Sequence, residues 1–181
     1  MKKILLVIDY QNDFVDGALG FRKAVVLEDA IALKIGEYRN NGDEVAFTFD
    51  THMEDYLNTR EGRSLPVSHC IKGTEGWHLY GKIATLCLET DMRFEKNTFG
   101  SLELTGYLAQ NKYDSIELVG VVSNICVLSN AVLAKAALPE AEIVVDASCT
   151  ASNDDQLNEE ALNVMESLQI KVTNRSCGNK R

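Results

Sequence analysis

The sequence predicts a three-layer α/β/α fold, in which helices cover both faces of a mostly parallel central sheet of about six strands. Short, continuous apolar runs are typical of strands that are buried on both faces, as in parallel sheets. These runs alternate with segments of helical periodicity, which is the pattern of successive β-α-β units. No internal repeat, low-complexity segment or linker divides the chain, so we expect one domain over residues 1–181.

The expected strands are short runs dominated by apolar residues. KILLVID, at residues 3–9, and EVAFTFD, at residues 44–50, both end in an aspartate. SIELVGV, at residues 115–121, is a third run of this kind. Shorter strands are expected at residues 91–95, 142–147 and 170–173.

Helices are expected between these strands. At residues 27–40 the apolar side chains recur at helical spacing, and Asn41-Gly42 supplies a stop signal. The segment at residues 155–168 is amphipathic. Residues 51–76 are polar and contain turn-forming residues, and a loop of that length inside a compact domain is usually functional. Further helices are expected at residues 77–88, 101–112 and 125–137.

The composition is that of an ordinary globular protein. Of the 181 residues, 45% are hydrophobic and 25% are charged. No apolar stretch approaches the roughly twenty residues that a membrane-spanning helix needs. The net charge is -9 and the basic residues are scattered, so we expect neither nucleic acid nor a membrane surface as a partner. Five cysteines without Cys-x-x-Cys spacing do not make a disulfide framework, which favours a reduced, cytoplasmic setting.

Chemically capable residues follow four of the expected strands. Asp9 ends the first strand and Asp50 ends the second. Lys96 follows the strand expected at residues 91–95, and Cys126 follows the strand expected at residues 115–121. Because ligands bind outside the carboxyl ends of the strands in open α/β sheets, these four residues define a candidate site at one edge of the sheet.

Cys126 stands where a strand gives way to a helix. An arbitrary cysteine is most often a small buried hydrophobic residue. The first turn of a helix, however, presents unpaired N–H groups and the positive end of the dipole, which stabilise a thiolate and could hold an oxyanion. Cys126 is therefore the candidate nucleophile. The other cysteines lack a comparable position: Cys70, Cys87, Cys149 and Cys177.

Asp9 and Lys96 are the candidate partners of this cysteine. Burial at a strand end would raise the pKa of Asp9 and make it a proton acceptor, although a turn or cap residue is the alternative interpretation. Lys96 would orient that carboxylate and offset its charge if it reaches it, and would otherwise be a solvated surface residue. No histidine lies near Cys126 in the sequence, so no Cys–His pair is predicted.

A second group of residues could bind a metal. Asp50 and His52 lie two residues apart at a strand end, and His69 comes from the far side of the long loop. Two histidines and a carboxylate suit Zn²⁺, Fe²⁺ or Mn²⁺ with positions left for water or substrate. Glu61 lies in the same loop and could add a fourth ligand. A turn held by hydrogen bonds is the alternative interpretation of the Asp-x-His pair.

Five segments occur in an order that is specific to one family. They are ILLVIDYQNDFVDG (4–17), FTFDTH (47–52), SHCIKGTEG (68–76), EKNTFGS (95–101) and GVVSNICV (120–127). Together they resemble the isochorismatase-like cysteine hydrolases, and within them the nicotinamidase (pyrazinamidase) branch. The resemblance implies an isochorismatase-like, Rossmann-like topology, a homo-oligomer and a small-molecule amide as substrate.

The resemblance also implies roles for individual residues. The family's catalytic triad matches Asp9, Lys96 and Cys126. Its non-proline cis peptide corresponds to Val121–Val122, and the backbone N–H groups of Val122 and Cys126 would form the oxyanion hole. The metal ligands of the nicotinamidase branch, most often zinc with iron or manganese as alternatives, match positions in the loop. These are Asp50, His52 and His69, with Glu61 as a further candidate.

The expected substrate pocket departs from the family in one respect. Many nicotinamidases place a Trp-Pro pair just before the last metal-binding histidine, so that the indole stacks on the pyridine ring. Here the segment begins at Leu65, lacks the aromatic residue and is one residue longer. Phe14 and Phe99 remain as possible ring contacts, and Leu65 is included with them as a candidate substrate contact.

The expected function is hydrolysis of nicotinamide to nicotinate and ammonia through a cysteine thioester, a step of NAD salvage. One alternative is the same chemistry on another small amide, such as a ureido or carbamoyl compound. A second alternative is a non-catalytic binding domain of this fold. A nucleotide-binding domain would carry a Gly-x-Gly-x-x-Gly motif after the first strand, where DYQNDFVDG stands instead.

Overall fold

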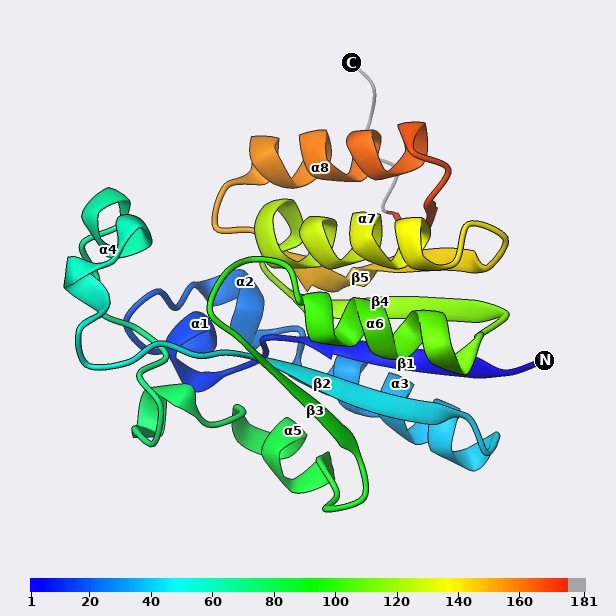
Figure 1. Ribbon diagram of the computed structural model, residues 1–181, viewed down its shortest axis with the longest axis horizontal. Coiled ribbons are helices and arrows are strands. Elements are labelled where there is room, and N and C mark those ends of the chain that lie inside the picture. Colours follow the sequence, from blue (N-terminus) through cyan, green and yellow to red (C-terminus); the bar gives the residue numbers. More distant parts are fainter. Residues whose placement is uncertain (176–181) are drawn as a thin grey trace.

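The expected α/β/α arrangement is present in the computed structural model, which describes residues 1–175. Six strands form one sheet in the order β3-β2-β1-β4-β5-β6, and every neighbouring pair is parallel (Figure 1). The strands are β1 (Lys3–Ile8), β2 (Glu44–Asp50), β3 (Met92–Lys96), β4 (Ser115–Val121), β5 (Glu142–Ala151) and β6 (Lys171–Thr173).

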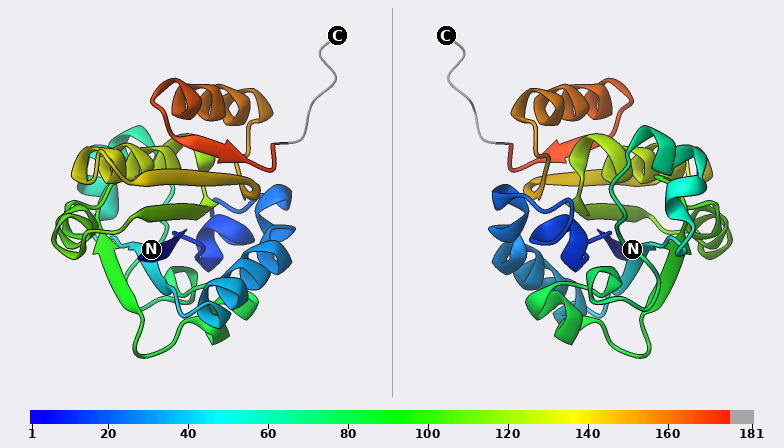
Figure 2. Two further views of the ribbon diagram at one scale, coloured as in Figure 1. Left: turned by 90° about the vertical axis from the view of Figure 1, so that its right-hand side faces the viewer. Right: turned by 90° about the vertical axis from the view of Figure 1, so that its left-hand side faces the viewer.

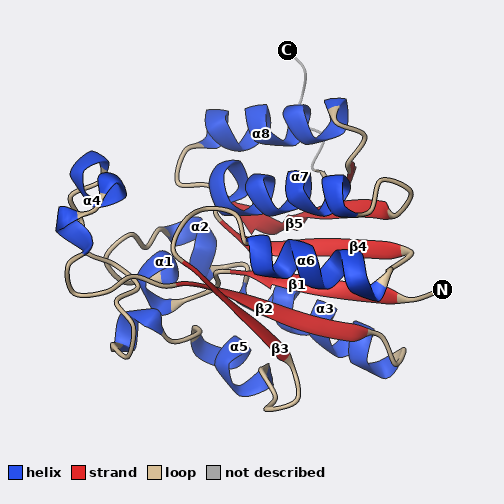
Figure 3. Cartoon of the chain, in the orientation of Figure 1, coloured by secondary structure: helices blue, strands red, loops and turns tan. Residues whose placement is uncertain are grey.

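Helices cover both faces of this sheet, as the end-on views in Figure 2 show. One face carries α6 (Leu102–Asn111), α7 (Leu128–Ala137) and α8 (Asp155–Ser167). The other carries α1 (Asn12–Val15), α2 (Arg22–Val25), α3 (Glu28–Asn40) and α5 (Gly81–Leu86). A short helix, α4 (Arg60–Ser64), projects beyond the carboxyl ends of the strands (Figures 1 and 3). Within residues 1–175, no helix is long and apolar enough to cross a membrane.

The first strand shows why a continuous apolar run is needed at the centre of such a sheet. Leu5 and Val7 pack into the core under α3, whereas Ile4, Leu6 and Ile8 pack into the core under α6 and α7. Successive side chains of a strand point to opposite faces, and here both faces are covered. All five side chains are at most 1% exposed, so a polar residue at any of these five positions would be buried in the core.

The strand order brings the chemically capable residues together. β1 lies between β2 and β4, and β3 lies on the outer side of β2. Because all the strands run in the same direction, their carboxyl ends meet at one edge. The residues at the ends of β1, β2, β3 and β4 therefore become neighbours, although more than a hundred positions separate the first from the last.

The structure differs from the expectation mainly outside the sheet. Residues 51–76 contain a 3₁₀ turn at Tyr56–Asn58 and α4, and a second 3₁₀ turn lies at Glu75–Trp77. The helix expected at residues 77–88 is shorter, because Gly81, at its first position, has a φ of 47° that ordinary helical geometry excludes. The four-residue helices α1 and α2 were not predicted, since segments that short show no measurable periodicity.

Two further elements have boundaries that differ from those expected. The strand expected at residues 142–147 continues to Ala151, past an irregularity in its pairing with β4. The helix expected at residues 125–137 is preceded by a π turn at Ser123–Val127, and α7 itself begins at Leu128. A bulge and a π turn each add a residue to a regular repeat, so a periodic pattern in the sequence does not reveal them.

A partly buried cluster of one cation and two carboxylates joins α3 to the middle of the sheet. The Nζ of Lys34 lies 2.9 Å from a carboxylate oxygen of Glu117 and 2.7 Å from one of Asp146. The hydroxyl of Tyr38 donates to the other oxygen of Glu117 at 2.7 Å. Burial alone would raise the pKa of Asp146, but the hydrogen bonds from Lys34 and Ser148 outweigh it and hold that pKa below its ordinary value.

We predict that Lys34→Met destabilises the protein by about 3 kcal/mol at neutral pH, because it leaves two carboxylates buried without their cation. The depressed pKa of Asp146 contributes stability above the unfolded-state value and loses it as the pH falls through the folded-state value. The difference in unfolding free energy between Lys34→Met and wild type should therefore become smaller below about pH 4. Urea unfolding at pH 7 and at about pH 3 measures both effects.

The control for this prediction is Lys23→Met. Lys23 pairs with Asp155, and both side chains are more than half exposed. A surface pair contributes at most about 1 kcal/mol, so this variant should unfold close to wild type at both pH values. Equal losses of unfolding free energy in the two variants would show that the Lys34 cluster stabilises the protein no more than a surface pair does.

Candidate active site

Asp9 begins the site at the end of β1. Its side chain is fully buried, and its backbone turns out of the strand with a φ of 44°. The hydroxyl of Thr48, on the adjacent β2, donates to Asp9 Oδ1 at 2.6 Å and accepts from the Asp9 N–H at 3.1 Å. This exchange holds the carboxylate in one orientation, with Oδ2 directed toward Lys96.

The ammonium of Lys96 occupies the centre of the site. Its Nζ lies 2.6 Å from Asp9 Oδ2 and 3.2 Å from Asp50 Oδ1. It also lies 3.6 Å from the Sγ of Cys126 and donates to the carbonyl of Thr98 at 3.0 Å. The side chain is 2% exposed, so this is a buried cation rather than a solvated surface lysine. The structure thus brings Asp9, Lys96 and Cys126 together.

The three groups shift one another's proton affinities. Burial would lower the pKa of Lys96, but the charges of Asp9, Cys126 and Asp50 outweigh it and raise that pKa. Burial raises the pKa of Asp9, with Lys96 acting against it. Burial also raises the pKa of Cys126 well above its ordinary value, and the charge of Asp9 adds to this effect. Burial and the carboxylate of Asp9 thus act against the thiolate that the helix terminus alone would favour, whereas the charge of Lys96 acts for it.

Gly120 allows the end of β4 to pass close to β1. Its φ is 108°, and a Cβ at this position would lie 2.1 Å from the carbonyl oxygen of Ile8. Its own carbonyl accepts a hydrogen bond from the hydroxyl of Thr150 at 2.7 Å. The peptide bond between Val121 and Val122 is cis. The chain then enters the π turn that carries Cys126.

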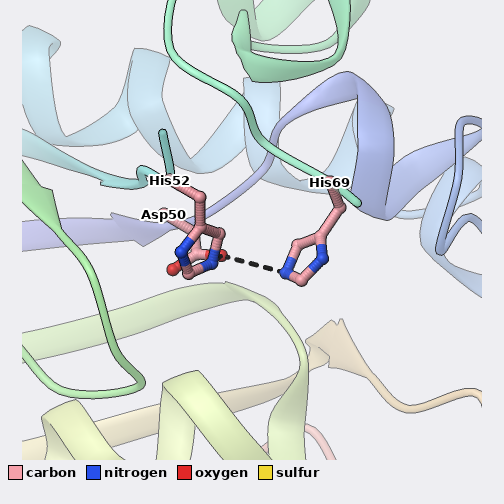
Figure 4. Close-up of side chains that lie close together, drawn as sticks. All are labelled: Asp50, His52 and His69. Atoms are coloured by element: carbon pink, nitrogen blue, oxygen red, sulfur yellow. Dashed lines mark hydrogen bonds and ion pairs between the residues drawn. The ribbon is translucent and has the colours of Figure 1, made fainter. Parts of the chain in front are cut away.

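The second group of candidate residues also lies together. Asp50, His52 and His69 are all buried, and one ligand atom from each lies within 4.8 Å of the others (Figure 4). Asp50 Oδ2 is 3.0 Å from His52 Nε2 and 3.4 Å from His69 Nε2. Glu61, from α4, is further out, with its Oε1 3.8 Å from His52 Nε2.

The donor set fits a divalent metal. Two imidazoles and a carboxylate suit zinc and its neighbours in the first transition row. His69 Nδ1 lies 2.8 Å from the carbonyl of Val67, and such an outer hydrogen bond leaves Nε2 free to face the cluster. Burial would raise the pKa of Asp50, but hydrogen bonds from His52 and His69 outweigh it and keep this carboxylate ionised.

Residues that the sequence analysis passed over hold this cluster in place. Gln11 is fully buried, and its side chain bonds both the N–H and the carbonyl of Asp50, at 2.8 and 2.9 Å. It also donates to the carbonyl of Trp77 at 2.8 Å. Asp13 accepts the N–H of Cys70, next to His69, at 2.7 Å. Both residues lie in DYQNDF, the signal that could have identified them.

A cavity of about 210 Å³ opens onto both groups. Its wall includes the three expected contacts, Phe14, Phe99 and Leu65, and its lining also includes Asp50 and Cys126. Phe14 is 7% exposed, whereas Phe99 and Leu65 stand at the mouth with 45% and 38% of their surface exposed. The lining residues that the sequence analysis missed are Leu19, Phe21, Ile125 and Asn153.

The other cysteines lie outside this arrangement. Cys70 and Cys149 are buried in the core on the α3 side of the sheet, and Cys87 is partly buried at the end of α5. Burial raises the pKa of each of these three thiols. Cys177 lies outside the described residues.

A parallel sheet with a buried Asp-Lys-Cys group at its carboxyl edge defines a class of hydrolase. The isochorismatase domain model matches residues 3–176. The chain belongs to the isochorismatase family. It is an amidohydrolase that acts on a C–N amide bond, in the nicotinamidase branch of that family.

Known proteins agree with this assignment. The chain is 38% identical to "uncharacterized isochorismatase family protein PncA" of Bacillus subtilis, over 73% of this chain and 78% of that protein. The crystal structure of nicotinamidase/pyrazinamidase PncA from Bacillus subtilis superposes with a TM-score of 0.86 at 33% identity, covering 95% of this chain and 99% of that one. The fold is also that of Pyrococcus horikoshii pyrazinamidase in complex with zinc, with a TM-score of 0.83 at 23% identity, covering 95% and 98%.

We predict that Gly120→Ala destabilises the protein by about 2 kcal/mol or more, because the new methyl group meets the Ile8 carbonyl and the backbone conformation excludes it. Gly106→Ala is the matched control, since this glycine lies inside α6 with nothing within 4 Å of the added atom. That control should gain about 0.5–1 kcal/mol through helix propensity. Urea unfolding compares the stabilities of the two variants. A Gly120→Ala variant as stable as wild type would contradict the close approach of Gly120 to the Ile8 carbonyl.

Proposed function

We propose that this protein is a nicotinamidase, which hydrolyses nicotinamide to nicotinate and ammonia through a thioester on Cys126. The observation that carries the proposal is the ammonium of Lys96, which lies between Asp9 and Cys126 beside the floor of an apolar cavity. Phe14 and Phe99 both line this cavity, and their rings offer apolar contacts to an aromatic substrate. The named relatives support the choice of substrate.

The chemistry begins with a proton transfer from Cys126 to Asp9. Burial raises the pKa of both groups, and a raised pKa makes the carboxylate of Asp9 a better acceptor for the thiol proton. The sulfur then attacks the amide carbon, and the backbone N–H groups of Val122 and Cys126 hold the oxyanion. Asp9 returns the proton to the leaving nitrogen, so that ammonia departs and the thioester remains.

Water completes the reaction. Asp9 removes a proton from the water, which attacks the thioester carbonyl, and the tetrahedral intermediate collapses to release nicotinate. The sulfur recovers a proton from Asp9, so each residue returns to its starting state. Throughout, Lys96 keeps Asp9 oriented and lowers the cost of negative charge on either partner.

Asp50, His52 and His69 would hold a divalent metal, with Glu61 as a further ligand. Zinc is the preferred ion for this donor set, and iron and manganese are the alternatives. When bound, the metal supplies a Lewis acid that anchors a ring nitrogen and an ordered water. A nicotinate product would feed NAD salvage. The cytoplasmic location and the homo-oligomeric state stay predictions.

One alternative is the same chemistry on a ureido or carbamoyl compound. The apolar walls favour a flat ring over such polar substrates, because a buried polar substituent without a partner is costly. Ammonia release from a panel of nicotinamide, pyrazinamide and small ureido compounds separates the two. The non-catalytic binding domain, the second alternative from the sequence, is set aside because the chain is an amidohydrolase of the isochorismatase family.

We predict that Cys126→Ala lowers the rate of ammonia release from nicotinamide by at least about a thousandfold, because no other nucleophile contacts the cavity floor. Cys87→Ala is the matched control and should keep wild-type activity, since Cys87 lies at the end of α5. Trapping of an acyl group on Cys126 by mass spectrometry tests the thioester directly. Equal activity in the two variants would remove the proposed nucleophile.

We predict that His69→Ala weakens zinc binding by more than about a hundredfold, because it removes a ligand of the buried cluster. Glu61→Gln should have a smaller effect, since its carboxylate stands 3.8 Å from the nearest ligand nitrogen. His78→Ala is the control, because this imidazole is exposed and outside the cluster. Competition with a chromophoric chelator measures the affinities, and wild-type affinity in the His69 variant would overturn the assignment.

A further inference from the structure

A buried amide lies behind the nucleophile. Asn130 is the third residue of α7, one helical turn after Cys126, and is 2% exposed. Its Nδ2 donates to the carbonyl of Cys126 at 2.8 Å and to the carbonyl of Phe99 at 3.0 Å. Its Oδ1 accepts the N–H of Ser101 at 3.0 Å. The amide group of Asn130 therefore uses both its donors and its acceptor, and two of these three hydrogen bonds are made to the segment between β3 and α6.

The segment that Asn130 contacts has little else to hold it. Residues 97–101 connect Lys96, at the end of β3, to α6. Within residues 1–175, no hydrogen bond between backbone groups holds residues 97–100. Lys96 Nζ also donates to the carbonyl of Thr98, and at the far end of the segment Ser101 caps α6 by accepting the N–H of Leu104 at 3.1 Å.

The partners decide the orientation of the amide. Two carbonyl oxygens require a donor, and the N–H of Ser101 requires an acceptor. A planar amide supplies this combination from one short side chain, whereas a hydroxyl has a single donor and a carboxylate has none. An apolar residue of the same shape would remove the side-chain partner of all three backbone groups, and two of these hydrogen bonds are buried, so the loss is costly.

We propose that Asn130 is a positioning residue, which fixes residues 97–101 relative to Cys126 and thereby sets the place of Phe99 at the cavity mouth and the approach of Lys96 to the sulfur. It touches neither the substrate nor the reacting atoms. The proposal rests on the proposed function in one respect, because its effect on turnover requires Cys126 to be the nucleophile. Its effects on the position of residues 97–101 and on the reactivity of the Cys126 thiol do not depend on that function.

The test compares Asn130→Leu and Asn130→Ala with Leu162→Ala. Leucine keeps the shape and removes every hydrogen bond, whereas alanine admits water that can satisfy the backbone groups without fixing their positions. Leu162 is buried in α8 away from the cavity, so its variant reports the effect of lost stability alone. The readouts are peptide-resolved hydrogen exchange, the rates of iodoacetamide labelling of Cys126 and Cys87, and kcat and KM for nicotinamide.

We expect faster exchange in residues 97–101 and an altered labelling rate at Cys126 in both Asn130 variants, with Cys87 unchanged. We also expect kcat/KM to fall by about tenfold or more, because small misplacements of reacting groups are expensive. If both variants lose only stability, as Leu162→Ala does, the proposal is overturned. A wild-type protein without amidase activity would instead refute the proposed function, and the exchange and labelling results would still decide the role of Asn130.

Discussion

The site depends on one buried ion pair, between the ammonium of Lys96 and the carboxylate of Asp9 at 2.6 Å. An isolated charge of either sign would be expensive at this depth, since each side chain is at most 2% exposed. When the two charges are paired, each offsets the cost of burying the other. The same ammonium also contacts a carboxylate oxygen of Asp50 and the sulfur of Cys126. Cys126 and the cluster of Asp50, His52 and His69 are therefore linked through a single cation.

The fold provides this pairing through strand order rather than through proximity in the sequence. β1 contributes Asp9, β2 contributes Thr48 and Asp50, and β3 contributes Lys96. These three strands are adjacent and parallel, so their last residues meet at one level. The apolar character of β1 belongs to the same design, because two covered faces are what exclude water from the carboxylate at its end.

The parts that were predictable are those that follow from periodicity and from parallel strand geometry. The sheet, its major helices and the edge that collects Asp9, Asp50, Lys96 and Cys126 all follow from apolar runs and the rule for ligand sites. The π turn before α7, the long β5 and the 3₁₀ turns between residues 51 and 80 break those periods and could not be predicted. The side chains that bond backbone across elements, such as Gln11, gave no signal beyond their place in a motif.

The surroundings of Cys126 oppose the thiolate that a helix terminus alone would favour. The sulfur is buried and faces a carboxylate, and together these raise its pKa. The ammonium of Lys96 acts in the opposite direction, because it lies 3.6 Å from the sulfur and 2.6 Å from Asp9. Burial raises the pKa of Asp9 in the same way. Two groups whose ionised forms are disfavoured by burial therefore share one cation, and the order of the strands is what brings that cation to both of them.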